Sequence, residues 1–262
     1  LSELFALQDH IVAELGIADL FDETPREAGT APRMDESSPN PVGRIDSAIP
    51  AASENVAVGG FAMAGVVIDP PPPIAPAVQS RNSSGQATVR AIRLESPIVM
   101  DGLLTEAVYE EVRAITGFIQ QEPVEGQPAT ERTEAWVLFD DENIYISARC
   151  WQSRMDQVVA NEMRRDEIFR NDNFAIVFDT FHDQRTGVLF RASPIGALMD
   201  MEFTEEPTFN IDWNTVWDVR TEYFDGGWTV EFVIPFRSLR YPAGAGRSWG
   251  INLGRTVLSK NE

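Results

Sequence analysis

The sequence predicts an all-β fold, an antiparallel β-sandwich with one short helix, for residues 87–262, preceded by a largely unstructured tether over residues 1–86. Three observations lead to this prediction. All six tryptophans lie after Ala87, and ten of the seventeen prolines lie before it. From Ala87 onward, short runs that alternate apolar and polar residues are separated by turn residues at intervals typical of a sandwich.

The tether contains one segment with a helical pattern. Its apolar residues are spaced as on one face of a helix, which predicts a short helix within residues 4–21: Leu4, Leu7, Ile11, Leu15 and Ala18. The prolines that follow, including the run at 70–73, are typical of an extended linker. We therefore expect the domain boundary near Ala87.

The elements of the sandwich are predicted in chain order. Residues 92–99 are expected to form an entry strand, and residues 104–112 one short helix. The strands 135–139 and 144–150 flank Asp140-Asp141-Glu142-Asn143, the clearest hairpin turn. A second hairpin turn is expected at Asp225-Gly226-Gly227, and the remaining strands at 174–181, 187–192, 198–203, 216–224, 228–234 and 250–257.

Composition excludes several function classes. The net charge of −20 argues against a nucleic-acid surface, because phosphate binding needs clustered Lys and Arg. Cys150 is the sole cysteine, so neither an intrachain disulfide nor a thiolate zinc site is expected. His10 and His182 are the two histidines, and no GxSxG, HExxH, Walker or GxGxxG pattern occurs. We therefore expect a binding protein rather than an enzyme.

The outward positions of the predicted strands carry polar and aromatic side chains. Alternation places Tyr145, Arg149 and Trp151 outward on one strand, and the outward set over all strands includes Arg149, Arg191, Asp200, Glu202, Asp218, Arg220 and Glu231. Sugar rings pack on flat aromatic rings, and their hydroxyls pair with carboxylate, amide and guanidinium groups. If the strands share one sheet, this face suits saccharides. The candidate binding residues are Trp151, Trp213, Tyr145, Arg149, Arg164, Arg165, Asp172, Arg191 and Asp200.

These residues also have ordinary structural interpretations. Outward charges commonly form solvated ion pairs, and a tryptophan at a strand end, such as Trp151, commonly caps a core. The default role of Arg164-Arg165-Asp166 is to hold a loop over one end of the sandwich. The pair Asp200 and Glu202 has the residue types of a glycosidase, although two acids on one strand face are more often a surface feature.

A calcium ion is the one candidate cofactor. Asp172, Asp179 and Asp183 are weak candidate ligands, because Ca²⁺ takes oxygen ligands and these residues lack EF-hand spacing.

Several strings resemble the carbohydrate-binding-module-like domains of family nine. They are residues 99–109 with Asp101-Gly102, the hairpin 139–146, the block from Arg164-Arg165-Asp166 to Phe181-His182-Asp183, and the segments 227–231, 234–236 and 249–252. The resemblance covers most of residues 90–262. It implies an immunoglobulin-like or jelly-roll sandwich, sugar binding, Ca²⁺ in some relatives, and a place at the amino-terminal side of large bacterial envelope proteins. The family's sugar-binding glutamate corresponds to about Ala175, a departure from the pattern.

The resulting expectation is a non-catalytic carbohydrate-binding module of an exported bacterial envelope protein, in the periplasm, in the outer membrane or outside the cell. Its partners would be an oligosaccharide or polysaccharide and, in the parent protein, a carboxyl-terminal domain. Two alternatives stay open. The domain could be a structural module that packs against that carboxyl-terminal domain, or a glycoside hydrolase-associated domain with weak or no activity of its own.

Overall fold

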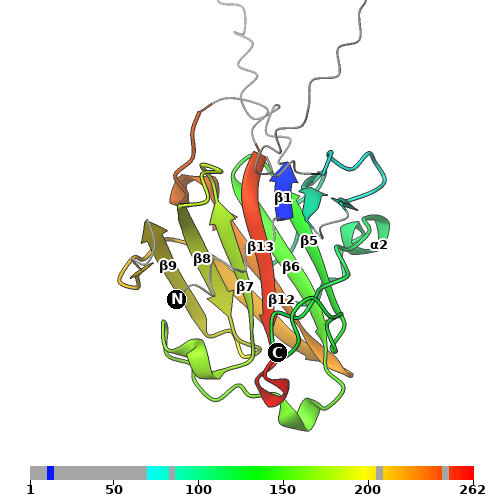
Figure 1. Ribbon diagram of the computed structural model, residues 1–262, viewed down its shortest axis with the longest axis vertical. Coiled ribbons are helices and arrows are strands. Elements are labelled where there is room, and N and C mark those ends of the chain that lie inside the picture. The colour runs from blue at the N-terminus through cyan, green and yellow to red at the C-terminus, as the bar shows by residue number, and fades with distance from the viewer. Residues whose placement is uncertain (1–10, 15–69, 83–85, 205–208, 244–247) are drawn as a thin grey trace, which may run out of the picture. The chain divides into compact units, whose positions relative to one another are not determined.

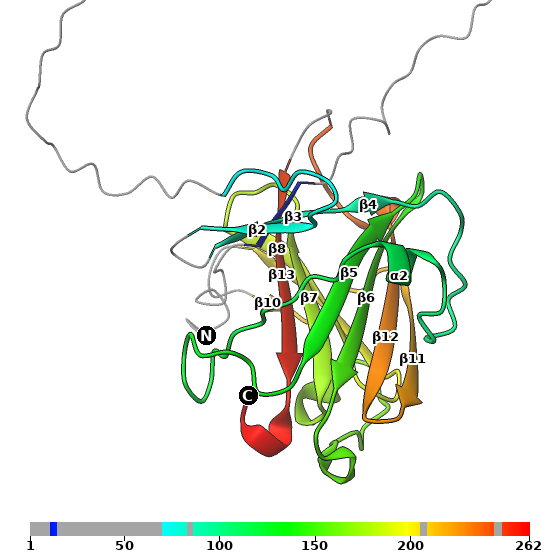
Figure 2. The same cartoon turned by 90° about the vertical axis from the view of Figure 1, so that its right-hand side faces the viewer.

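The computed structural model describes residues 11–14, 70–82, 86–204, 209–243 and 248–262 (Figure 1). Within these ranges the chain forms two β-sheets that face each other, as Figure 2 shows edge-on. The fold is therefore an all-β sandwich, as predicted. None of the helices in the described ranges has the length and apolar character needed to cross a membrane.

Sheet A has eight strands among the described residues, in the order β10 (Phe209–Asn210), β9 (Leu198–Thr204), β8 (Thr186–Ala192), β7 (Asn173–Asp179), β13 (Ser248–Thr256), β1 (Ile11–Glu14), β3 (Ala87–Arg90) and β2 (Gln79–Arg81). Sheet B has five, in the order β11 (Asp218–Phe224), β12 (Gly227–Pro235), β6 (Asn143–Trp151), β5 (Thr133–Phe139) and β4 (Ile92–Arg93). Neighbouring strands are antiparallel except in the pairs β1 with β3 and β4 with β5.

Short helices join the strands. The α-helix α2 spans Val108–Glu111, and the 3-10 turns are η2 (Met155–Gln157), η3 (Ile168–Arg170), η4 (Phe236–Ser238) and η5 (Leu258–Lys260). The two predicted hairpin turns are confirmed, since they connect β5 to β6 and β11 to β12.

The core lies between the two sheets. Alternate residues of each strand point inward and become buried, including Phe174, Phe178, Phe190, Trp228, Phe232 and Trp249. The rings of Phe174 on β7 and Phe232 on β12 have centroids 6.3 Å apart, so the sheets are in direct contact. Each such fully buried side chain contributes about 1.5–3 kcal/mol to folding.

The outer face of sheet B is covered by the segment 94–114, which contains α2 (Figure 2). Glu231 on β12 is fully buried beneath it. Its carboxylate accepts hydrogen bonds from the backbone N–H of Gly102 at 2.7 Å and from the Tyr109 hydroxyl at 2.8 Å. Gly102 has φ +85°, and a Cβ there would lie 3.0 Å from the backbone of Thr221. The Asp101-Gly102 motif thus has a structural role, because its tight turn supplies donors to a buried acid.

The strands that carry the expected polar face do not share one sheet, so the condition for that face is not met. Arg149, Asp218, Arg220 and Glu231 belong to sheet B, whereas Arg191, Asp200 and Glu202 belong to sheet A. Asp200 and Glu231 are also fully buried, although both were expected to point to solvent. Asp200 is directly opposite the core residue Phe190, so its side chain points toward the interior of the sandwich. Glu231 does point away from the core, but the segment 94–114 covers it.

The amino-terminal part of the domain also differs from expectation. Ile11–Glu14 forms strand β1 between β13 and β3, where a helix was expected within residues 4–21. Its Ile-Val-Ala run fits a strand between two partners as well as a helical stripe. The rest of that segment lies outside the described residues. Strand β2 and residues 70–82 extend the compact unit before the expected boundary at Ala87.

Two element lengths differ as well. The entry strand expected at 92–99 is limited to Ile92–Arg93, and the helix expected at 104–112 to Val108–Glu111. Residues 94–107 instead run irregularly over the outer face of sheet B, where apolar contacts hold them. The apolar pattern there reports burial rather than strand pairing.

Candidate functional site

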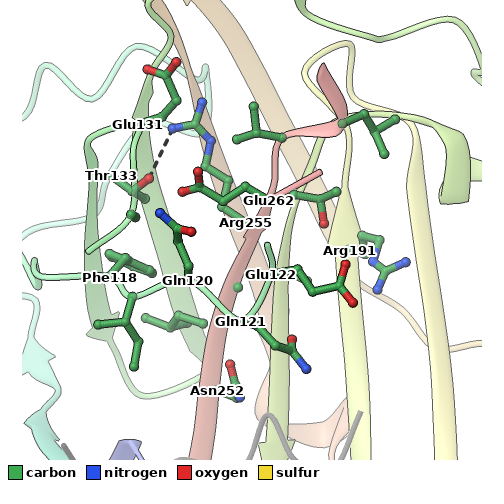
Figure 3. A pocket seen from close by; sticks show the side chains of 18 of the residues that line it. Phe118, Gln120, Gln121, Glu122, Glu131, Thr133, Arg191, Asn252, Arg255 and Glu262 are labelled. Atoms are coloured by element: carbon green, nitrogen blue, oxygen red, sulfur yellow. Dashed lines mark hydrogen bonds between the residues drawn. The ribbon is translucent and has the colours of Figure 1, made fainter. Parts of the chain in front are cut away.

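A cavity of about 480 Å³ lies on the outer face of sheet A (Figure 3). Its floor consists of the middle strands β13, β7 and β8. One wall comes from residues 118–122 with parts of 129–133, and another from the carboxyl-terminal residues 257–262. The cavity is thus built from segments that are far apart in the sequence.

The floor is hollow because its side chains are small. The strand register places Gly254, Ala175 and Arg191 in one row across β13, β7 and β8. A Cβ added at Gly254 would meet no atom within 4 Å. Ala175 adds only a methyl group, so an open space lies beside Arg191.

The wall contributes an amide group without a full set of partners. Gln120 is buried, and its Nε2 donates a hydrogen bond to the carbonyl of Pro128 at 2.9 Å. Its Oε1 is also buried and accepts no hydrogen bond within the described residues. Gln121 and Asn252 place two more amides around the same space, and Phe118 adds an aromatic ring (Figure 3).

Arg191 is the charged group of the floor. In the ranges that the structure describes, its guanidinium carbon lies 5.6 Å from the centroid of the Phe169 ring, a cation–π contact, and the guanidinium forms no ion pair there. Its Nε is buried and has no hydrogen-bond acceptor there. Burial lowers the pKa of Arg191, because desolvation disfavours its charged form. Phe169 itself is 56% exposed, so its ring is accessible beside the guanidinium.

The acidic residues of the cavity wall are held by neighbours. Glu122 accepts a hydrogen bond from Asn261 at 3.0 Å, and Glu262 accepts one from the backbone N–H of Thr130 at 2.8 Å. Glu131 is buried, lies 2.6 Å from Lys260 Nζ and accepts two hydrogen bonds from Ser153. Burial raises the pKa of Glu131, but the bonds from Lys260 and Ser153 outweigh it and lower this pKa overall.

The two candidate tryptophans lie elsewhere. Trp151 ends β6 on the outer face of sheet B, where the guanidinium of Arg132 stacks 4.0 Å from its ring. Trp213 packs against the central core, with its ring centroid 6.1 Å from that of Phe190. Neither side chain lines the cavity.

Among the other candidates, only Arg191 lines the cavity. Tyr145 donates a hydrogen bond to Asp140, and burial together with this bond raises the pKa of Tyr145 to about 12. Arg149 lies over the ring of Trp136 on sheet B.

The remaining candidates form ion pairs or hydrogen bonds away from the cavity. Arg164 pairs with Glu162 and Glu167, and Arg165 pairs with the buried Asp200. Asp172 accepts a hydrogen bond from the backbone N–H of Leu258 at 2.9 Å. This bond fixes the carboxyl-terminal wall of the cavity, so Asp172 acts on the site indirectly.

The candidate calcium ligands do not share one site. Asp172 directly precedes β7 and Asp179 ends it, so the length of the strand separates them. Asp179 accepts hydrogen bonds from the backbone N–H groups of Asp183 and Gln184, and Asp183 accepts from Arg185 and Thr186. Over the ranges described, no three His, Cys, Asp or Glu side chains are grouped to hold a metal ion.

Several residues that line the cavity were not predicted from the sequence. Gln120 and Gln121 lie in an irregular segment, where no periodicity indicates which side chains point inward. Asn252 and Ala175 could have been found, because both alternate with core residues on strands that the sequence did predict. Phe169, which contacts Arg191 but does not line the cavity, could have been noticed as an aromatic residue in the polar block around Arg164-Arg165-Asp166.

No family model matches the sequence, and no curated protein matches it. Among solved structures, the chain is similar to a carbohydrate-binding module of family 9 from Caldicellulosiruptor kristjanssonii in complex with cellotriose, with 14% identity and a TM-score of 0.40 over 62% of this chain and 82% of that chain. A complex of such a module with glucose, from the same organism, gives 13% identity and a TM-score of 0.40 over 62% and 84%. At this distance, the function of the present chain must be argued from its own residues.

Proposed function

We propose that the chain is a non-catalytic carbohydrate-binding module that holds a saccharide in the cavity on the outer face of sheet A. The observation that carries this proposal is the set of polar groups without partners at that cavity. The Oε1 atom of Gln120 and the Nε atom of Arg191 are both buried and have no hydrogen-bond partner in the described chain. Buried polar atoms of this kind normally have partners, and a ligand would supply them.

The chemistry of the cavity suits a saccharide. Amide groups such as those of Gln120, Gln121 and Asn252 donate and accept hydrogen bonds, and a sugar hydroxyl does the same. Phe118 lines the space, and Phe169 is exposed beside Arg191. Aromatic rings offer flat apolar surfaces to the C–H faces of a sugar ring. A volume of about 480 Å³ is within the range of ordinary small-molecule sites.

The state of the acidic residues favours binding over catalysis. A glycosidase needs a carboxylic acid whose pKa is raised so that it can protonate the leaving group. The pKa of Glu131 is lowered instead, and its carboxylate is bound by Lys260 and Ser153. Glu122 is likewise bound by Asn261.

We extend the proposal to the location of the protein, an exported bacterial envelope protein. A net charge of −20 suits a surface in contact with the periplasm or the medium. The sole cysteine, Cys150, is buried, so an oxidising compartment would not bring its thiol into contact with an oxidant. Cell fractionation of the native host tests this part separately from the binding activity.

The experiment that tests the binding proposal is to fill the cavity. In Gly254→Leu the new side chain would project into the open floor, with no strain from the backbone, because Gly254 has no positive φ. We expect this variant to lose binding in a glycan array and in calorimetric titration while its thermal unfolding stays unchanged. Glu222→Leu, a matched substitution at an exposed strand position of sheet B, should keep the binding of the unsubstituted chain.

Two results would contradict the proposal. The first is the absence of binding to any glycan on a broad array by the unsubstituted chain. The second is a Gly254→Leu variant that binds as tightly as the Glu222→Leu control, because the ligand would then lie elsewhere.

A further inference from the structure

Arg191 differs from several other arginines of the described residues in how its charge is paired. Arg93, Arg154, Arg164 and Arg220 each lie within 4 Å of a carboxylate, and their side chains are at least 39% exposed, so water already hydrates them. Arg191 is more enclosed, yet it has no carboxylate partner among the described residues. The sequence contains 41 acidic residues against 21 basic ones, so acids are abundant elsewhere.

Other enclosed arginines are neutralised or bonded by the protein itself. Arg90 and Arg255 also have a buried Nε without a hydrogen-bond partner, but both donate through their other nitrogens. Arg90 donates to the carbonyl of Ala77, and Arg255 donates to the carbonyl of Arg132, to Thr133 and to Gln152. Burying an ionised group without a partner is costly, and an arginine keeps its charge in proteins under ordinary conditions. The packing of the described residues therefore does not explain why the guanidinium of Arg191 has neither an ion pair nor a hydrogen-bond acceptor.

A side chain of the protein itself could pair with Arg191 from the neighbouring positions in the same row of the sheet. Ala175 is directly opposite Arg191 on β7, and Gly254 follows in the same row on β13. An acidic side chain at either position would neutralise the guanidinium, but these residues are too small and leave the cavity open. Figure 3 shows Arg191 at the β8 side of that space, with Gln120 and Asn252 on other elements around it.

We infer that the saccharide carries a carboxylate, so that the ligand is a uronic-acid-containing glycan whose carboxylate meets the guanidinium of Arg191. The inference rests on the proposed function and names the class of saccharide for the same cavity. The planar fork of an arginine matches a carboxylate with two parallel hydrogen bonds. The amides of Gln120 and Asn252 then take the neutral hydroxyls of the sugar.

The acidic residues of the cavity walls have partners other than Arg191. Glu122 accepts a hydrogen bond from Asn261, and Glu262 accepts one from the backbone N–H of Thr130. A ligand carboxylate at Arg191 would therefore displace no ion pair that the described residues form. At physiological salt, charges further away than about 8 Å are screened, so the negative net charge of the chain does not outweigh the local contact.

The test compares saccharides that differ only in this charge. The unsubstituted chain is titrated in a calorimeter with trimers of galacturonate, mannuronate, guluronate and a glucuronate-containing trimer, each as the free acid and as its methyl ester. The ester keeps the ring and its hydroxyls but removes the charge. We expect at least one acid to bind about 10- to 100-fold more tightly than its ester, the difference that a charge-assisted bidentate contact provides.

Variants of Arg191 separate a binding role from a structural one. Arg191→Met should bind the acid and the ester equally, with its thermal unfolding midpoint unchanged or higher, because it removes an unpaired charge from an enclosed site. Arg191→Lys keeps the charge but loses the fork, so its preference for the acid should be intermediate. A merely structural arginine would instead lower the unfolding midpoint when replaced by Met.

The outcomes distinguish the two proposals. Equal binding of acids and esters by the unsubstituted chain would overturn the inference but leave carbohydrate binding intact, and so would an acid preference that survives in Arg191→Met. If no saccharide of either kind binds, the proposed function fails and the inference fails with it. The comparison of acid and ester on the unsubstituted chain remains decisive even if a variant does not fold.

Discussion

Each outer face of the sandwich has an enclosed charged residue, and the two residues differ in whether the described chain supplies hydrogen-bond partners. On sheet B, the carboxylate of Glu231 is enclosed by the segment 94–114 and accepts hydrogen bonds from Gly102 and Tyr109. On sheet A, the guanidinium of Arg191 has a neighbouring ring, that of Phe169, and an open cavity. Both residues point away from the core, but within the described residues only Glu231 has hydrogen-bond partners for its charged group.

This difference distinguishes a charged residue that stabilises the fold from one that is free to contact a ligand. A buried charge with a full set of internal partners holds a loop in place, and its loss is felt by the fold. A buried charge that faces a cavity without a partner adds nothing to the fold and is available to a ligand. The sequence alone presents both as polar residues on strands.

The largest effect is expected from removing the satisfied charge. Glu231→Ala should lower the free energy of unfolding by about 2–4 kcal/mol, because the Gly102 N–H and the Tyr109 hydroxyl lose their acceptor where water has little access. Urea denaturation measures the change. Glu222→Ala, an exposed control on β11, should change the free energy by less than about 0.5 kcal/mol. Equal effects of both substitutions would remove the contrast between the two faces.

A smaller effect is expected from pH. Burial raises the pKa of Glu231 above the ordinary glutamate value of about 4.3. The folded state then holds this proton more tightly than the unfolded state, so this contribution to stability is present below about pH 4.3 and is lost as pH rises through the raised pKa. Glu231→Gln cannot ionise and removes the contribution.

The measurement is the free energy of unfolding of both proteins from pH 4 upward. The stability of the unsubstituted chain relative to Glu231→Gln should decline as pH rises through this window and level off above it. A relative stability that rises with pH would mean that the buried acid prefers its charged form, contrary to the direction of the shift.

The smallest effect is expected at Trp151. Because its ring lies on sheet B and the cavity on sheet A, Trp151→Ala should leave saccharide affinity unchanged within a factor of about two. Calorimetric titration with the ligand found for the unsubstituted chain provides the measurement. If this substitution abolishes binding, the site lies around Trp151 on sheet B and the assignment to sheet A is wrong.

The sequence was sufficient to predict the sandwich and the longer strands β5–β9 and β11–β13, because alternating runs and turns such as Asp225-Gly226-Gly227 depend on local patterns. It did not predict the short strands β1 and β2. It was also sufficient to select Arg191 as a candidate. It could not show that Arg191 has no hydrogen-bond partner among the described residues, since that depends on Ala175 and Gly254 in other strands. The burial of Glu231 was missed because it depends on the segment 94–114 that covers its face. The burial of Asp200 was missed because this residue is on the core-facing side of its strand.

The cavity also depends on contacts between segments that are distant in the sequence. Its floor includes β13, which pairs with β7 in the middle of sheet A, and its wall includes residues 257–262, which Asp172 and Glu131 hold in place. The cavity is therefore complete only when these segments, which are far apart in the sequence, have come together. Binding of a ligand there would report that sheet A and the segments that wall the cavity have folded.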